Sequence, residues 1–217
     1  MPTLIIGNQN YSSWSLRPWI LLKHAGIAFD TRRIGLFTDT FKAEITQYSE
    51  AGKVPVYQDG GLTLWESLAI CEYVAELRPE LWPDEPQARA IARAVCSEMH
   101  AGFNALRNEL PMNCRARNRR ISITDQCRAD IDRVESIWRQ CREQYGSEGP
   151  WLFDRYSVAD AFFAPVVLRF QAYELTLTEE THAYCQTVLA DPHLQQWISA
   201  GRAESEVLAE DEAGEDP

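Results

Sequence analysis

The sequence predicts an α/β domain over residues 1–79, followed by an all-α domain over residues 87–203. Three observations support this division. Strand-like apolar segments alternate with helical runs only in the first domain. A Pro-rich connection, RPELWPDEP, occupies residues 78–86. No strand signal follows this connection. Because strands and helices are segregated along a chain long enough to bury a full core, we expect two packed units.

The first predicted unit is a strand, a helix and a second strand. Thr3–Gly7 is a short apolar segment typical of a strand, and Trp14–Ala25 is an apolar helical run that ends near Gly26. Phe29–Ile34 alternates weakly and suits a strand that begins after this stop. An irregular stretch follows.

A hairpin and a helix complete the α/β domain. The segments Val54–Gln58 and Leu62–Leu64 are separated by DGG, a strong signal for two antiparallel strands. Glu66–Leu77 then has the pattern of a helix with a mixed apolar face. A β-α-β unit followed by a β-hairpin and a helix is the thioredoxin-like arrangement.

The second domain is predicted to consist of helices only. The expected helices are Gln87–Glu109, Thr124–Tyr145, Ser157–Gln171, Thr178–Leu189 and Pro192–Ala200. Ser157 precedes Asp160 by three residues at the start of an apolar run, which is a capping-box pattern that fixes where a buried helix begins.

The composition is that of a soluble globular protein, with 45% hydrophobic and 24% charged residues. No apolar run approaches the ~18 residues of a membrane span, and the start, MPTLIIGNQ, lacks the features of a secretory signal, so we expect cytoplasmic residence. The six cysteines show neither a CxxC pair nor zinc-like spacing. We therefore expect buried free thiols and no metal site.

The acidic charge is concentrated at the C-terminus. The net charge is −11, and residues 204–217 hold seven acidic residues and no basic one, which leaves −4 for residues 1–203. A mildly acidic body disfavours nucleic-acid binding. The tail itself, ESEVLAEDEAGEDP, is expected to be a solvated, disordered end.

The turn after the first strand, NYSSWSLRPW, gathers hydroxyl side chains at the start of a helix. In thioredoxin-like redox proteins this turn carries CxxC, whereas here Ser12 to Ser15 occupy that spacing, so this turn cannot exchange disulfides. A hydroxyl at a helix N-terminus favours an anion. The alternative is that Ser13 or Ser15 simply caps the helix.

Two further segments of this domain carry candidate binding groups. In GKVPVY, a cis peptide before Pro55 would turn the Val54 backbone towards an extended ligand, and a trans edge-strand proline is the alternative. In LWESLAI, Glu66 and Ser67 stand at a helix start, where they are able to hold the α-ammonium and α-carboxylate of an amino acid. Simple capping of that helix is again the alternative.

Together these segments resemble the cytosolic glutathione transferase family over residues 3–200. The resemblance rests on S-x-x-S, V-P about forty residues later, E-S eleven residues after the proline, and S-x-x-D in an all-α half. The serine-type classes are the most similar, especially zeta-like and bacterial members, whose turn S-S-C-S-W-R is matched by SSWSLR. Trp14 replaces the cysteine of that pattern and Leu16 its tryptophan, which argues against the isomerase chemistry of the zeta class and against reductase activity.

The resemblance implies that glutathione is the co-substrate and assigns a role to each matching residue. Ser12 would donate a hydrogen bond to the glutathione sulfur, with Ser13 and then Tyr11 as alternative donors. Val54 would pair its backbone with the cysteinyl part of glutathione. The γ-glutamyl end would be held by Glu66 and Ser67, and the glycyl carboxylate by Lys53.

The electrophile pocket is expected between the turn and the first helix of the all-α domain. Its candidate residues are Tyr11, Trp14, Met99, His100, Phe103 and Arg107. His100 and Arg107 lie seven residues apart on one helical face, and His100 has no evident carboxylate partner. The alternative is that Met99 and Phe103 belong to the core or to a dimer contact.

The leading expectation is a glutathione transferase that acts on small electrophiles in detoxification, as a homodimer by resemblance. A maleylacetoacetate-isomerase-like enzyme is a second possibility, for which an anion-binding arginine such as Arg17 or Arg107 would be required. A third is a non-catalytic member that serves as an interaction or ligand-carrier protein.

Overall fold

The structure, a computed structural model, describes residues 1–216. Its N-terminal part contains one sheet of four strands in the order β2-β1-β3-β4. The strands are β1 (Thr3–Ile6), β2 (Asp30–Arg33), β3 (Val56–Asp59) and β4 (Leu62–Trp65). β1 pairs with β2 in parallel and with β3 antiparallel, and β3 and β4 form the hairpin that DGG predicts.

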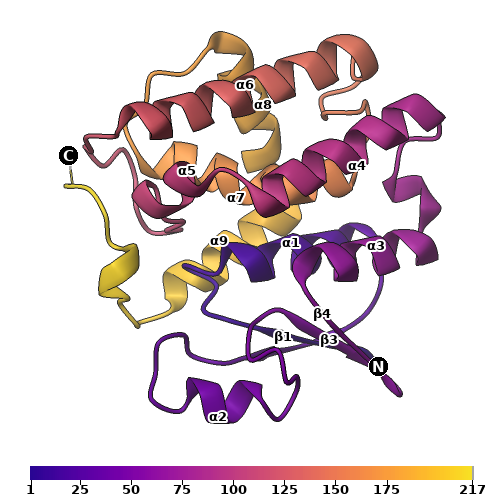
Figure 1. Cartoon of the computed structure of the whole chain (residues 1–217), viewed down its shortest axis with the longest axis vertical. Helices are drawn as coiled ribbons and strands as arrows, with labels where there is room; N and C mark the ends of the chain where they lie inside the picture. The colour runs from indigo at the N-terminus through magenta and orange to yellow at the C-terminus, as the bar shows by residue number, and fades with distance from the viewer. Residues whose placement is uncertain (217) are drawn as a thin grey trace.

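Helices cover both faces of this sheet. α1 (Ser13–His24) and α3 (Ser67–Leu77) lie between the sheet and the helical domain, whereas α2 (Phe41–Ile45) lies on the opposite face (Figure 1). Strand alternation explains the two layers, because Leu4 and Ile6 join the main core while Ile5 packs with Ile45 of α2. The short α2 falls in the stretch that the sequence leaves irregular.

The remaining chain forms the helical domain. Its helices are α4 (Pro86–Ala101), α5 (Asn104–Glu109), α6 (Asp125–Tyr145), α7 (Val158–Ala172), α8 (Glu179–Leu189) and α9 (Pro192–Ala203). Two short 3₁₀ turns, η1 (Pro79–Leu81) and η2 (Ala209–Asp211), flank the domain. α7 is buried over nearly its whole length and contacts α1, α4 and α8, so it joins the two domains.

The single helix predicted over Gln87–Glu109 is wrong, because the chain breaks between α4 and α5. Phe103 takes a left-handed conformation, with φ of 60°, and buries its ring in the core. Arg107 folds back over the break and donates hydrogen bonds to the carbonyls of Gly102 (2.8 Å), Met99 and His100. The guanidinium thus pairs carbonyl groups that the end of a helix leaves free.

The capping box at α7 is confirmed. The Ser157 N–H and hydroxyl both donate to one carboxylate oxygen of Asp160 at 2.9 Å. The other oxygen accepts from the Leu152 N–H at 3.1 Å and from the Tyr184 hydroxyl at 2.9 Å. Asp160 is fully buried, and burial raises its pKa.

The acidic tail differs from the expectation of a disordered end. Residues 204–216 pack against both domains and run past the start of α1 (Figure 1). Glu206 pairs with Arg33 at 2.6 Å and Glu212 with Arg119 at 2.7 Å. Acidic side chains of the tail therefore pair with basic side chains of the two domains, and composition alone does not reveal this pairing. Pro217, which the predicted tail included, lies outside the described residues.

All six cysteines are buried free thiols, as the sequence predicts. Within residues 1–216, no helix is long and apolar enough to cross a membrane. The same residues contain no group of three or more His, Cys, Asp or Glu side chains placed to hold a metal ion.

Candidate active site

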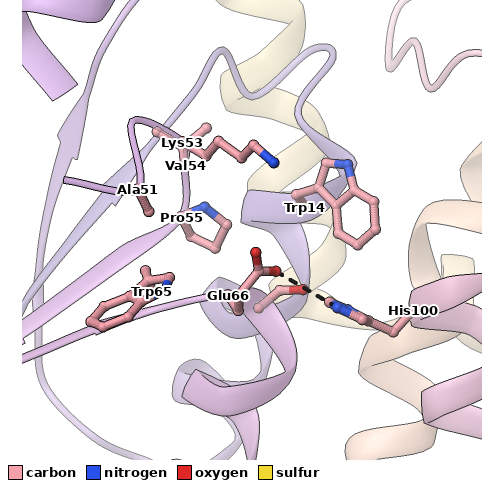
Figure 2. A pocket seen from close by; sticks show the side chains of 9 residues that line it. Trp14, Ala51, Lys53, Val54, Pro55, Trp65, Glu66 and His100 are labelled. Atoms are coloured by element: carbon pink, nitrogen blue, oxygen red, sulfur yellow. Dashed lines mark ion pairs between the residues drawn. The ribbon is translucent and has the colours of Figure 1, made fainter. Parts of the chain in front are cut away.

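Three segments of the N-terminal domain meet at one cavity of about 340 Å³ (Figure 2). They are the start of α1, the approach to β3 and the start of α3. The cavity is lined by Trp14, Ala51, Lys53, Val54, Pro55, Trp65, Glu66, Ser67 and His100. The structure thus brings together all four residues expected to bind glutathione.

The approach to β3 offers an unpaired stretch of backbone. The Val54-Pro55 peptide is cis, and the sheet ladder begins only at Val56, so Val54 lies outside it. The Lys53 side chain extends across the cavity towards Trp14 (Figure 2). An extended ligand would find free backbone and a positive charge on this wall.

The start of α3 places two polar side chains in the same cavity. Glu66 has a left-handed backbone, with φ of 70°, which costs on the order of 1–3 kcal/mol in a residue with a side chain. Ser67 begins the helix, is 1% exposed, and its hydroxyl has no hydrogen-bond partner among residues 1–216. A buried, unpaired hydroxyl at a helix N-terminus is suited to an incoming carboxylate.

His100 has a carboxylate partner, so the expectation of an unpaired histidine is wrong. Its Nε2 lies 3.6 Å from the Glu66 Oε2, and its ring meets Trp14 edge-on at 5.4 Å between centroids (Figure 2). Burial lowers the pKa of His100, Glu66 opposes this, and Arg17 and Arg107 lower it further. The pair joins the α/β domain to the helical domain, and only the docked domains reveal it.

The serines of the turn have distinct partners. The Ser12 hydroxyl donates to the Ser15 oxygen at 2.8 Å, and this oxygen also accepts from the Gly7 N–H at 3.1 Å. The Ser13 oxygen accepts from the Arg169 Nη2 at 3.4 Å. Ser12 occupies the N-cap position of α1 but makes no side-chain cap, so the expectation that Ser13 or Ser15 caps this helix is wrong.

A second cavity of about 490 Å³ adjoins the first and contains both candidate serines. It is lined by Tyr11, Ser12, Ser13, Trp14, Leu36, Phe37, Phe41, Lys53, Val54, Arg107, Asn108, Pro111, Met112, Arg169 and Asp211. The two cavities share Trp14, Lys53 and Val54. The two serines therefore line the larger cavity, next to the residues that it shares with the first, and both apolar and charged side chains surround them.

Trp14 separates the two cavities and is held between cations. The Arg17 and Arg107 guanidiniums each lie 4.5 Å from its ring centroid. Arg17 is fully buried, and its Nε donates to the Phe162 carbonyl at 3.2 Å. Such stacking stabilises a guanidinium that has lost its water.

Arg17, Arg107 and Arg169 form a positive cluster around the turn. Burial lowers the pKa of Arg107 to about 10 and that of Arg169 to about 10, and burial lowers the Arg17 pKa well below its usual range. Among residues 1–216, none of the three lies within 4.0 Å of a carboxylate. Their charge is therefore not neutralised by a salt bridge, and Arg107 and Arg169 line the second cavity.

The predicted pocket residues divide into two groups. Tyr11, Trp14 and Arg107 line the second cavity, and His100 lines the first. Met99 and Phe103 belong to the buried core and line neither.

The sequence-based reasoning missed Arg169 and Asp211, which line the second cavity. They come from α7 and from the tail, so no local spacing signal connects them with the turn. The Tyr11 hydroxyl donates to the Glu212 carboxylate at 2.6 Å. Burial together with this hydrogen bond raises the pKa of Tyr11.

Comparison with solved structures identifies the fold. A glutathione transferase homolog from a Burkholderia species, solved with bound glutathione, superposes with a TM-score of 0.72 at 22% identity, covering 94% of this chain and 99% of that one. A theta-class glutathione S-transferase from Xanthomonas axonopodis pv. citri, also with glutathione, gives 0.67 at 21% identity, with 91% and 96% covered.

Sequence comparison gives the same family. The maleylacetoacetate isomerase of Rattus norvegicus is 27% identical over 183 residues, 82% of each chain. That of Mus musculus is 34% identical over 112 residues, so the match spans about half of each chain. Residues 11–77 match the family description "Glutathione S-transferase, N-terminal domain" and residues 88–200 its C-terminal domain. The chain therefore belongs to the glutathione S-transferase family.

Proposed function

We propose that the protein is a glutathione transferase that activates the thiol of glutathione for attack on small electrophiles. The observation that carries this proposal is the pair of adjoining cavities with the serine turn at their junction. The first cavity holds the polar groups expected to bind glutathione, and the second combines apolar side chains with charged ones. A sulfur at the junction would face a ligand in the second cavity.

The proposed contacts to glutathione follow from the polar groups that line the first cavity. The Glu66 carboxylate binds the γ-glutamyl ammonium, and the Ser67 hydroxyl with the α3 N-terminus binds the neighbouring carboxylate. The Val54 backbone pairs with the cysteinyl residue, and Lys53 binds the glycyl carboxylate. Ser67 supports this assignment most directly, since its buried hydroxyl lacks a partner among the described residues.

Ser13 is the better candidate for the hydrogen bond to sulfur. The Ser12 hydroxyl already donates to Ser15, whereas the Ser13 oxygen accepts from Arg169 and leaves its own proton for a ligand. A free thiol titrates near ~8.5, so a nucleophile at pH 7 needs this value lowered by about two units, or roughly 2.7 kcal/mol. A hydrogen bond to the thiolate, the α1 N-terminus and the nearby guanidiniums together supply energy of this size.

A glutathione-dependent isomerase of the maleylacetoacetate type is the second candidate. The relative from Rattus norvegicus bears that name, and Arg107 and Arg169 in the second cavity would suit an anionic substrate. Trp14 in place of the cysteine of the similar zeta-class turn argues against it. Isomerisation of maleylacetoacetate at a rate above conjugation of an aryl halide would favour this candidate over the first.

Binding of glutathione is tested by calorimetry with the variant Glu66→Gln. We expect affinity to fall about 10- to 100-fold, because a charge-assisted contact contributes roughly 1.5–3 kcal/mol. Glu76→Gln, an exposed position on the same helix, is the matched control and should bind as the wild type does. Absence of binding by the wild-type protein would contradict the proposal and favour an interaction or carrier protein. The homodimer and a detoxification role remain predictions from the resemblance, and cytoplasmic residence remains a prediction from the sequence pattern.

A further inference from the structure

The tail is tied to the turn that carries the candidate serines. The Glu204 carboxylate accepts hydrogen bonds from the backbone N–H groups of Gln9 (2.8 Å) and Asn10 (3.1 Å). Arg115 of the helical domain donates to the Glu204 and Glu206 carbonyls, both at 2.7 Å. The tail thus begins with contacts to both domains.

A second set of contacts holds the tail beyond η2. The Glu212 carboxylate accepts from the Tyr11 hydroxyl at 2.6 Å and from the Asn113 amide at 2.9 Å, and it pairs with Arg119 at 2.7 Å. Since Glu204 and Glu212 are both anchored, the 3₁₀ turn Ala209–Asp211 between them is fixed beside the second cavity.

Asp211 is the carboxylate that this turn supplies to the second cavity. The other charged side chains that line the cavity are Lys53, Arg107 and Arg169, all cationic. Arg169 is 4% exposed, and its Nε has no hydrogen-bond partner within residues 1–216. Burial raises the pKa of Asp211, Arg169 opposes this and Glu210 and Glu212 add to it, and Asp211 lines the same cavity as Arg169.

We propose that Asp211 determines the charge specificity of the electrophile site, by partly offsetting Arg107 and Arg169. The inference rests on the proposed function of the same site. An electrophile with a carboxylate is attracted by the guanidiniums and repelled by Asp211, whereas a neutral electrophile is indifferent to both. Removing the Asp211 charge should therefore favour the anionic substrate.

The test compares a chlorodinitrobenzene with the matching chlorodinitrobenzoate. In both, the glutathione sulfur forms a C–S bond to the ring carbon, the C–Cl bond breaks, and chloride leaves with the bonding electron pair. For a charge on the order of 8 Å away at an intermediate dielectric, Asp211→Asn should raise the anionic-to-neutral ratio of kcat/KM roughly fivefold. Asp211→Lys should raise it further, and Glu76→Gln, exposed on α3 and outside the cavity, should leave it unchanged.

An unchanged ratio in both Asp211 variants would overturn the inference. An equal loss of kcat/KM with both substrates would also overturn the inference, because it would indicate that Asp211 has a structural role only. Turnover of neither substrate by the wild type would contradict the proposed function instead. In that case calorimetry would measure the affinities of the two S-aryl glutathione conjugates. The anionic-to-neutral ratio of these affinities, compared between wild type and the Asp211 variants, would then test the role of Asp211.

Discussion

The assignment of Ser13 as the thiol donor makes a quantitative prediction for Ser13→Ala. The variant removes a hydroxyl whose oxygen accepts from Arg169 and whose proton is available to a ligand. A hydrogen bond to a charged acceptor contributes about 1.5–3 kcal/mol. At about 1.4 kcal/mol per pKa unit, the pKa of the bound glutathione thiol should rise by about one to two units.

The same arithmetic gives the change in rate. At about pH 5.5, below the pKa of the thiol in both proteins, the thiolate fraction and kcat/KM should fall about 10- to 100-fold. The difference in kcat/KM between wild type and Ser13→Ala should disappear at high pH, where the thiol is ionised in both proteins. Ser12→Ala should change the thiol pKa far less, since the Ser12 proton is already donated to Ser15 at 2.8 Å.

The assay is a pH titration of the ultraviolet absorbance of the thiolate on the glutathione-saturated protein. S-methylglutathione, which has no ionisable thiol, gives the background. A rise of the thiol pKa in Ser12→Ala with no rise in Ser13→Ala would assign the hydrogen bond to sulfur to Ser12. No rise in either variant, together with a rise in Tyr11→Phe, would refute the serine mechanism.

Three further predictions concern stability. Asp160→Ala should lower the free energy of unfolding by about 3–6 kcal/mol in urea titrations, because it leaves several buried donors unpaired, and Asp160→Asn should cost less. Gly201→Ala would place a Cβ 2.9 Å from the Asn10 backbone nitrogen, so we expect a loss of about 1–3 kcal/mol and a slower enzyme, whereas an unchanged protein would contradict that packing. Burial raises the pKa of Asp191, but the His24 imidazole 2.8 Å away and a hydrogen bond from the Leu194 N–H more than offset this and lower it. The stability it contributes is present above about pH 4 and is lost as the pH falls through the lowered value, so wild type and Asp191→Asn should converge in acid.

Much of the fold follows from local signals. DGG predicts the β-hairpin, and the Ser157–Asp160 pair predicts the start of α7, because turn geometry and capping involve residues close in sequence. The break between α4 and α5 has only Gly102, the C-cap of α4, as a local signal. It contains no proline, and the left-handed Phe103 is held by burial of its ring in a core that the whole domain forms.

The site could be predicted only in part for the same reason. Lys53, Val54, Glu66 and Ser67 belong to segments whose order along the chain indicates where they meet, and they line one cavity. The contact between Glu66 and His100 depends on how the two domains dock. The tail depends on cations scattered over distant elements, so its sequence suggests disorder although residues 204–216 pack against the body.

The burial of the cysteines has a consequence for the proposed function, which would expose the protein to thiol-reactive compounds. Burial raises the pKa of Cys114 to about 12, of Cys141 to about 12 and of Cys185 to about 12, so almost no thiolate forms at neutral pH. The position in the turn where similar proteins carry a cysteine is occupied by Trp14. The buried cysteines therefore present almost no thiolate to compete with glutathione in the proposed reaction, and the protein should survive exposure to alkylating agents that inactivate cysteine-dependent enzymes.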